Sequence, residues 1–195
     1  NTNLTITPIW LIDSSIYVFR AWFVKASPVL DQNGEAINAV RGFLRWVYQL
    51  LSTENPSHIA FAFDTSKTDS IRRQLYPLYK ANRLAAPDNL KYQFNLCREF
   101  ITALGLAQAS SPGYEADDVI GTWVQQQTMA QPCYIISGDK DLMQLVREHD
   151  IWWDYGQRAA LNKGKVKRES GVWPHQIADQ LALAGDVADN IPGID

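Results

Sequence analysis

Histidine and cysteine are scarce in this chain, which has three His and two Cys among its 195 residues. Structural zinc sites need several such ligands at close spacing, and Cys97 and Cys133 do not have that spacing. Two thiols also provide no disulfide framework, so we expect a protein of a reducing cytosol. The composition therefore excludes most zinc proteins and the small disulfide-rich secreted proteins.

Long apolar runs are also missing. No stretch approaches the ~20 consecutive apolar residues that a membrane-spanning helix needs. Residues 1–7 contain neither a basic stretch nor a long apolar core, so we expect no secretory signal. With 46% hydrophobic and 20% charged residues, the chain is expected to be a soluble, cytoplasmic protein with one good-sized core and no membrane partner.

Carboxylates are present in quantity and are concentrated in a few motifs. Three of them fall within four residues, and others end three separate apolar runs. Seven acids lie in these four places: Asp13, Asp64, Glu115 with Asp117 and Asp118, and Asp139 with Asp141. Because the carboxyl ends of parallel strands meet at one edge of a sheet, we expect these acids to share a site. So many negative charges share a site only where cations bind or some carboxyls are protonated.

Apolar periodicity predicts alternating strands and helices. We expect strands over 9–12, 59–63, 133–137 and 151–154. We expect helices over 37–52, 90–104 with Gly105 at its C-terminal end, 115–127, 140–146 and 174–184. Residues 75–87 are expected to be irregular or weakly helical, and 156–171 to form a basic loop. This alternation predicts an α/β fold with a three-layer, mainly parallel sheet.

Oxygen-rich sites without His or Cys favour Mg²⁺ or Mn²⁺. Two such ions about 4 Å apart can activate a water and stabilise the leaving oxygen of a phosphodiester. The formal net charge of −3 opposes binding to nucleic acid, but it hides an asymmetry. If Asp186 and Asp189 join the seven acids above, nine of the 21 acids lie in the site, and 12 remain against 18 Lys and Arg. A basic surface around an acidic pocket is typical of an enzyme that binds and cuts a polyanion.

Two basic segments differ in what they indicate. Between Ser70 and Pro87 lie four cations, two tyrosines and no acid: Arg72, Arg73, Tyr76, Tyr79, Lys80 and Arg83. This segment directly follows the strand that ends at Asp64. We therefore expect it to guide single-stranded DNA rather than to be only a solvated loop. Lys80 could also neutralise charge that grows on a phosphate in the transition state. The second run comprises Arg158, Lys163, Lys165, Lys167 and Arg168, and we expect it to be only a solvated loop.

Five motifs, in order along nearly the whole chain, resemble those of the 5′-nuclease superfamily. This superfamily includes the 5′→3′ exonuclease domain of bacterial DNA polymerase I, the phage 5′-exonucleases and the flap endonucleases. The motifs are Leu-Ile-Asp-Ser-Ser at 11–15 with Arg20; Phe-Ala-Phe-Asp at 61–64 with Tyr-Lys-Ala-Asn-Arg at 79–83; Gly-Tyr-Glu-Ala-Asp-Asp at 113–118; Ser-Gly-Asp-Lys-Asp-Leu at 137–142; and Gly-Asp at 185–186 with Asp-Asn-Ile-Pro-Gly at 189–193.

The resemblance implies a role for each matching residue. Nine acids would bind Mg²⁺ or Mn²⁺, two ions or more, directly or through water: Asp13, Asp64, Glu115, Asp117, Asp118, Asp139, Asp141, Asp186 and Asp189. Lys80 and Arg83 would contact the scissile phosphate, and Arg20 would lie near the single-stranded 5′ end. Arg72, Arg73 and Tyr79 would also contact DNA.

The resemblance also implies an organisation and an activity. Residues 1–173 would form a PIN-like catalytic domain with an arch or clamp segment at 66–90. Residues 174–195 would begin a helix–three-turn–helix, which would bind duplex DNA and K⁺ if the native chain continues. The expected activity is divalent-metal-dependent 5′→3′ exonuclease and 5′-flap endonuclease cleavage of DNA by a monomer, in replication or repair.

Other interpretations remain open at this point. A catalytically weak DNA-binding paralogue should have lost metal acids, and none is lost here. A PIN-type ribonuclease shares the sheet but usually has about half the acids and no Tyr-Lys-x-x-Arg clamp. A Toprim enzyme would need a Glu where Asp13 stands, and a haloacid-dehalogenase-type phosphatase would need an Asp where Ser15 stands.

Overall fold

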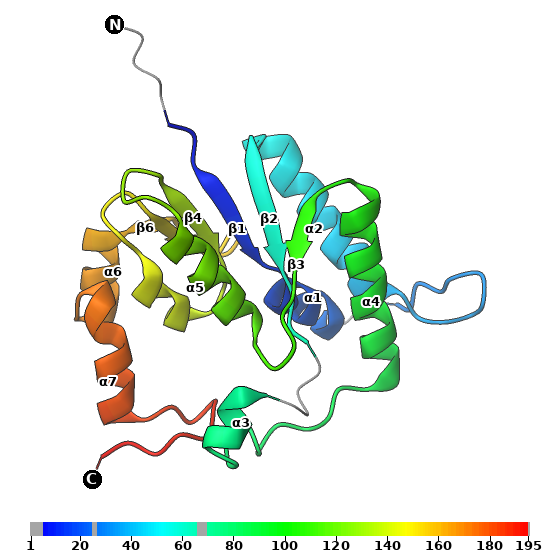
Figure 1. Cartoon of the computed structure of the whole chain (residues 1–195). Helices are drawn as coiled ribbons and strands as arrows, with labels where there is room; N and C mark the ends of the chain where they lie inside the picture. Colours follow the sequence, from blue (N-terminus) through cyan, green and yellow to red (C-terminus); the bar gives the residue numbers. More distant parts are fainter. Residues whose placement is uncertain (1–5, 25–26, 66–69, 195) are drawn as a thin grey trace, which may run out of the picture.

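A six-stranded sheet forms the centre of the computed structural model, which describes residues 6–24, 27–65 and 70–194 (Figure 1). Its strands are β1 (Ile9–Asp13), β2 (His58–Ala62), β3 (Ala107–Ala109), β4 (Cys133–Ile136), β5 (Ile151–Trp153) and β6 (Leu161–Asn162). Their order is β3-β2-β1-β4-β5-β6, with β1 to β5 parallel and β6 antiparallel to β5. The predicted mainly parallel sheet is confirmed.

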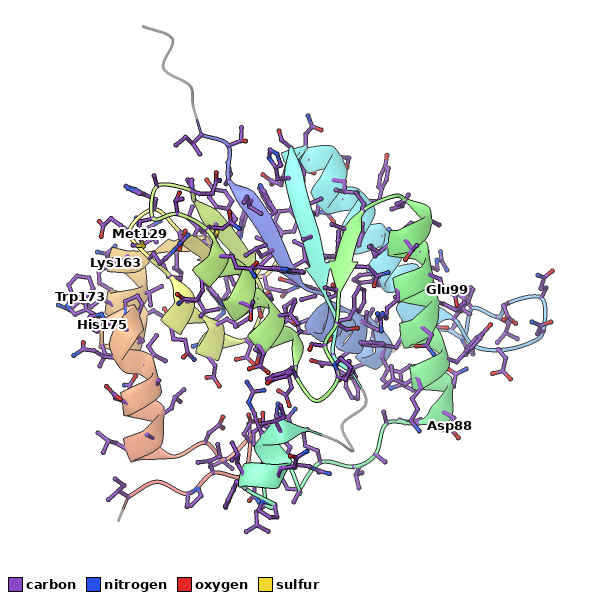
Figure 2. All side chains as sticks on the ribbon, in the orientation of Figure 1. Asp88, Glu99, Met129, Lys163, Trp173 and His175 are labelled. Atoms are coloured by element: carbon purple, nitrogen blue, oxygen red, sulfur yellow. The ribbon has the colours of Figure 1, made fainter. Side chains whose placement is uncertain are left out.

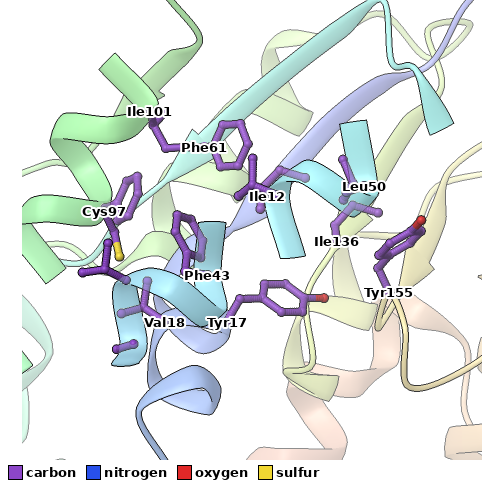
Figure 3. Close-up of a cluster of buried hydrophobic side chains, with 14 of the residues drawn as sticks. Ile12, Tyr17, Val18, Phe43, Leu50, Phe61, Cys97, Ile101, Ile136 and Tyr155 are labelled. Carbon is purple, nitrogen blue, oxygen red and sulfur yellow. The ribbon is translucent and has the colours of Figure 1, made fainter. Parts of the chain in front are cut away.

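Helices cover both faces of the sheet, which gives the expected three layers (Figure 1), and side chains occupy the space between the layers (Figure 2). On one face lie α1 (Ser14–Phe23), α2 (Asn38–Glu54) and α4 (Asp88–Ala103). On the other lie α5 (Ala116–Gln126), η2 (Lys140–Leu145), α6 (Lys163–Ser170), η3 (Pro174–Gln176) and α7 (Ile177–Ala184). Along β1, Trp10 and Ile12 belong to the first core and Leu11 to the second, as side chains alternate along a strand (part of the first core is shown in Figure 3).

The chain reverses direction across the sheet next to β1. The connections from β1 to β2 and from β2 to β3 run through α2 and α4 on one face, whereas the connection from β3 to β4 runs through α5 on the other. The carboxyl ends of β1 and β4 therefore flank a topological switch point, which is where ligands bind in open α/β sheets. The short α3 (Ile71–Leu75) lies beyond this edge, near the segment that follows α7 (Figure 1).

The ends of the predicted helices follow local signals. Asn55, in the left-handed conformation at φ 44°, ends α2, and Gly105 at φ 69° follows α4. Glu115 caps α5 rather than forming its first turn. The predicted helix over 140–146 is a 3₁₀ helix, η2. None of the helices in the described residues is long and apolar enough to cross a bilayer.

Helix α1, strand β3 and the short helix α3 were not predicted. Helix α1 begins directly after β1, and its Ile, Tyr, Val and Phe residues have only modest helix propensity. Burial of Tyr17 and Val18 against the sheet stabilises it instead. Strand β3 has only three residues, Ala-Gln-Ala, which is too short for a recognisable alternation.

The expectation of a basic loop over 156–171 was wrong. Part of this segment forms β6 and α6. The Asn162 side chain caps α6 by accepting a hydrogen bond from the Lys165 backbone N–H at 3.0 Å, and Gly171 at φ 83° ends it. Val166 packs into the second core. The loop was predicted from the charged composition, but the capping residues Asn162 and Gly171 stabilise a helix there despite that composition.

Candidate metal and phosphate site

Asp13, Asp64 and Asp139 lie at the carboxyl ends of β1, β2 and β4, as expected. Asp13 is 4% exposed. Its Oδ2 accepts a hydrogen bond from the Ser137 hydroxyl at 2.7 Å, and the Ser137 Oγ accepts one from the Asp139 backbone N–H at 2.9 Å. Burial raises the pKa of Asp13 to about 7, with further contributions from the charges of Asp64 and Asp139.

The N-terminus of α5 binds two of the acids. Glu115 and Asp118 form a capping box, in which Asp118 accepts from the Glu115 backbone N–H at 2.9 Å. Asp64 accepts from the Ala116 N–H at 2.8 Å, so its carboxylate lies at the positive end of the helix dipole. The Ser15 hydroxyl accepts from the Asp64 N–H at 2.9 Å. Burial still raises the pKa of Asp64 above its usual range.

Asp117 has the least compensated charge of the group. Burial raises its pKa to about 8, and Asp13, Asp139, Asp64 and Glu115 each add to the shift. Among the described residues, its carboxylate has no hydrogen bond and no ion pair. Asp117 is only partly buried in solvent-accessible area, but a desolvated carboxylate surrounded by other carboxylates is the group that a divalent cation would neutralise most favourably.

Asp141 and the two acids after α7 complete the cluster. The Asp141 N–H donates to Asp139 Oδ1 at 2.9 Å. Burial raises the pKa of Asp141 to about 6, with contributions from Asp139, Asp186 and Asp189. Asp186 lies in a tight turn that its bridge to Ile191 closes. All nine predicted acids therefore lie on the same side of the molecule, although they come from distant parts of the chain.

Cationic side chains from residues 72–83 form ion pairs with Glu115, Asp118 and Asp189. Arg72 contacts Glu115 and Asp118, each at 2.9 Å. Lys80 Nζ lies 2.7 Å from Glu115 and 3.6 Å from Asp189. Arg83 contacts Asp189 at 2.6 Å. These three are among the five cations that the resemblance assigns to DNA, so the clamp and the acids form one charge network.

The backbone at Lys80 is strained. Its φ of 51° is unusual for a residue other than glycine, and its N–H donates to the Asp189 carbonyl at 2.9 Å. This hydrogen bond ties the clamp segment to the turn after α7. The Lys80 side chain contacts Glu115. Backbone strain of the kind seen at Lys80 is typical of functional positions.

Glu115 differs in its electrostatics from the buried aspartates. Burial alone would raise its pKa, but the hydrogen bond and charge of Lys80, the charge of Arg72 and a hydrogen bond from Tyr79 outweigh burial. The pKa of Glu115 therefore lies below its ordinary value, and this carboxylate is ionised across the physiological range.

The other predicted DNA contacts have protein partners. Arg73 donates to the carbonyls of Tyr79 and Lys80 at 3.1 and 3.2 Å. Tyr79 is 6% exposed, and its hydroxyl donates to Glu115 at 3.1 Å, so its ring is not exposed for stacking. Arg20 is paired with Asp154. Part of the predicted arch, residues 66–69, lies outside the described residues.

The donor set fits a divalent metal. Its ligands would be carboxylate oxygens only, and Asp117 supplies a partly buried carboxylate without a partner among the described residues. As the side chains stand, no group of three His, Cys, Asp or Glu in residues 6–24, 27–65 and 70–194 converges on one point closely enough to hold an ion. The reason is that backbone amides and the clamp cations already bind several of the oxygens. Metal binding at this site would therefore require side-chain rearrangement.

Two cavities adjoin the acids. One of about 810 Å³ runs along α5 and is lined by Arg72, Tyr114, Asp117, Asp118 and neighbouring residues of α5 and η2. A smaller one of about 50 Å³ is lined by Asp64, Lys80, Arg83 and Glu115, among others. Two cations and two acids therefore line the same small space.

Three residues that contact the site were not predicted as site residues: Ser15, Ser137 and Asp154. Ser15 and Ser137 stand inside quoted motifs, so their proximity to the acids was visible in the sequence. Their partners were not, because Ser137 binds an acid from the opposite end of the chain. Nothing in the local pattern marked Asp154.

Comparisons with known proteins identify the family of this chain. Residues 8–171 match the family model described as "5'-3' exonuclease, N-terminal resolvase-like domain". The chain is 36% identical to a 5'-3' exonuclease of Aquifex aeolicus over 189 residues, which cover 96% of this chain and 64% of that protein. It is 39% identical to DNA polymerase I of Pseudomonas aeruginosa over 188 residues, 96% of this chain and 20% of the polymerase. The chain thus spans about two-thirds of the first relative and a fifth of the second.

Solved structures show the same fold. The bacteriophage T5 5'-exonuclease superposes with a TM-score of 0.71 at 19% identity, covering 97% of this chain and 67% of that one. A T5 flap endonuclease, solved as a pseudo-enzyme-product complex with DNA and metal ions, gives a TM-score of 0.75 at 18% identity over 96% of this chain and 70% of that one. With the family model covering most of its length, the chain belongs to the 5'-3' exonuclease family, and residues 8–171 are its N-terminal resolvase-like domain.

Proposed function

We propose that this chain is the catalytic part of a divalent-metal-dependent 5′-nuclease that hydrolyses DNA phosphodiesters, stepwise in the 5′→3′ direction and at 5′ flaps. The observation that carries the proposal is that nine acids lie near Lys80 and Arg83 on one side of the molecule. The relatives' names, and the T5 complex with DNA and metal ions, support it.

The acids are proposed to hold Mg²⁺ or Mn²⁺. Asp13, Asp64, Asp117, Asp139 and Asp141 would form the inner part of the site. Glu115, Asp118, Asp186 and Asp189 would act directly or through water. Such ions, when bound as a pair, activate a water and stabilise the leaving oxygen. K⁺ is proposed only for a helix–three-turn–helix that begins within 174–195 and continues beyond it.

The chain's own side chains would position the phosphate. Lys80 reaches the acids from the clamp, so its ammonium would neutralise charge on the reacting phosphate. Arg83 would position the same phosphate, and Arg72 and Arg73 would attract the neighbouring backbone. Arg20 would contact the 5′ end, and the Tyr79 ring would support Arg72 and Lys80, which lie 5.8 and 4.8 Å from its centroid.

The organisation follows from the same assignment. Residues 1–173 are proposed as the PIN-like nuclease domain, with the clamp over 66–90. The enzyme is proposed to act as a cytoplasmic monomer in replication or repair. DNA with a single-stranded 5′ flap or 5′ end would be its substrate.

The test is cleavage of a labelled 5′-flap duplex with and without Mg²⁺, comparing wild type with Asp139→Asn and Asp141→Asn. We expect Mg²⁺-dependent cleavage that both variants lose while they retain DNA binding, since removing negative charge does not weaken attraction to phosphate. Binding without cleavage by wild type would indicate a DNA-binding paralogue. Preferential cleavage of an RNA strand would indicate a PIN-type ribonuclease.

A further inference from the structure

Arg20, near the C-terminal end of α1, forms a bidentate ion pair with Asp154, the residue that follows β5. The two N–O distances are 2.5 and 2.9 Å. Asp154 is 3% exposed, whereas the Arg20 side chain is partly exposed. The planar fork of the guanidinium is therefore fixed in one orientation by a buried partner.

This guanidinium lies against the backbone of Gly138. A Cβ placed on Gly138 would lie 2.0 Å from Arg20 Nη2 and 2.6 Å from Cζ. The end of a free arginine could swing away from such a contact at little cost. Asp154 prevents this movement, because displacement would break both hydrogen bonds of a pair whose acid is buried.

Gly138 belongs to the loop that carries Asp139 and Asp141. Ser137 ties this loop to Asp13 at 2.7 Å, and the Trp152 indole N–H donates to the Asp139 carbonyl at 2.9 Å. The Arg20 guanidinium contacts the loop at the residue between these two attachments. This contact connects the loop to α1.

We propose that Asp154 is a positioning residue, which holds the Arg20 guanidinium against Gly138 and thereby fixes the loop that places Asp139 and Asp141. The consequence for metal affinity rests on the proposed function, whereas the positioning of the loop does not. Arg20 is thus assigned a role within the protein in addition to its proposed contact with DNA.

The chain offers a matched control at the opposite end of the same strand. Asp150 precedes β5, is 1% exposed and is paired with Arg147 at 2.7 Å. It also accepts from the Cys133 N–H at 2.8 Å, at the amino edge of the sheet and away from the acids. Asp150→Asn therefore damages a buried pair of the same chemistry without touching the loop.

The experiment compares wild type, Asp154→Asn and Asp150→Asn by native-state hydrogen–deuterium exchange, with peptides of α2 as the internal reference. We expect Asp154→Asn alone to speed exchange at the amides of Asp139 and Asp141, relative to α2. We also expect Asp154→Asn to weaken Mn²⁺ binding, measured by electron paramagnetic resonance, by about 10-fold, as for loss of a group that orients a metal ligand. Asp150→Asn should leave both unchanged relative to α2.

Gly138→Ala supplies an independent arm, because its methyl group would displace the same guanidinium. Its effect on exchange should not add to that of Asp154→Asn, since either change removes one contact. Equal exchange in wild type and Asp154→Asn, or an equal change in Asp150→Asn, would overturn the proposal. If wild type binds no Mn²⁺, the proposed function fails, and the exchange data still decide whether Asp154 positions the loop.

Discussion

Two sets of carboxylates meet at the edge of the sheet, and they differ in what neutralises them. The inner carboxylates are Asp13, Asp64, Asp117, Asp139 and Asp141. Burial and neighbouring carboxylates raise the pKa values of four of them, Asp13, Asp64, Asp117 and Asp141. The paired carboxylates are Glu115, Asp118 and Asp189, which are bound by Arg72, Lys80 and Arg83.

The difference separates two tasks within one network. The inner carboxylates lie on the sheet and α5, are short of cations and suit a metal. The paired carboxylates are neutralised by side chains that the proposed function assigns to phosphate. A phosphate that recruits Lys80 or Arg72 would release Glu115, so DNA and metal should favour each other's binding.

Asp117→Asn should have the largest effect. Asp117 is an inner carboxylate without a partner among the described residues. Its replacement by Asn should therefore lower the rate of single-turnover flap cleavage by at least about 10²-fold. Asp118→Asn provides the comparison from the paired set, and its loss should be smaller. If Asp118→Asn were the more damaging change, the division into two sets would fail.

Lys80→Ala should slow the saturated cleavage rate by on the order of 10²-fold, as for removal of one preorganised transition-state donor. Its loss should remove about one phosphate contact from the salt dependence of binding. Arg83→Ala should instead raise the dissociation constant and leave the saturated rate closer to wild type. A Lys80→Ala enzyme that binds weakly but cuts normally when saturated would make Lys80 a docking residue.

Arg72→Gln should strengthen Mn²⁺ binding in the absence of DNA by about 3–10-fold, the equivalent of roughly 1 kcal/mol for a partly exposed ion pair. The reason is that Arg72 competes for Glu115 and Asp118. Arg73→Gln is the control, because Arg73 binds only backbone carbonyls within the described residues and its loss should leave Mn²⁺ affinity unchanged. Weaker Mn²⁺ binding in Arg72→Gln would mean that this arginine organises the acids for metal.

The smallest effect concerns pH. When a chelator keeps the site free of metal, protonation of Asp13 and Asp117 adds to the free energy of unfolding. This contribution is complete below about pH 3.8, the pKa of an Asp in the unfolded chain. It is lost as the pH rises through the folded-state pKa values, about 7 for Asp13 and about 8 for Asp117. The Tm in chelator should therefore fall by a few degrees between pH 6 and 9, at about 2–4 °C per kcal/mol. Asp117→Asn should flatten the decline. The pH dependence from Glu115 has the opposite sign, because its pKa is lowered in the folded protein. Its contribution to stability is present above about pH 4.5 and is lost on acidification.

The position of the inner carboxylates could be predicted because it depends on local pattern. A short apolar run followed by Asp13, Asp64 or Asp139 indicates both the strand and the edge where it ends. The partners of the paired carboxylates could not be predicted, since Arg72 reaches Glu115 and Lys80 reaches Asp189 only through the tertiary fold. The prediction of a loop at α6 was wrong because it relied on the basic composition, whereas Asn162 and Gly171 define the ends of a helix.

The most direct test of the two-set account is anomalous diffraction from crystals of the wild-type protein soaked in Mn²⁺. The account predicts an ion in contact with Asp117 and with at least one of Asp13, Asp139 and Asp141. Ions bound only at Glu115 and Asp189, with Asp117 making no metal contact, would contradict it.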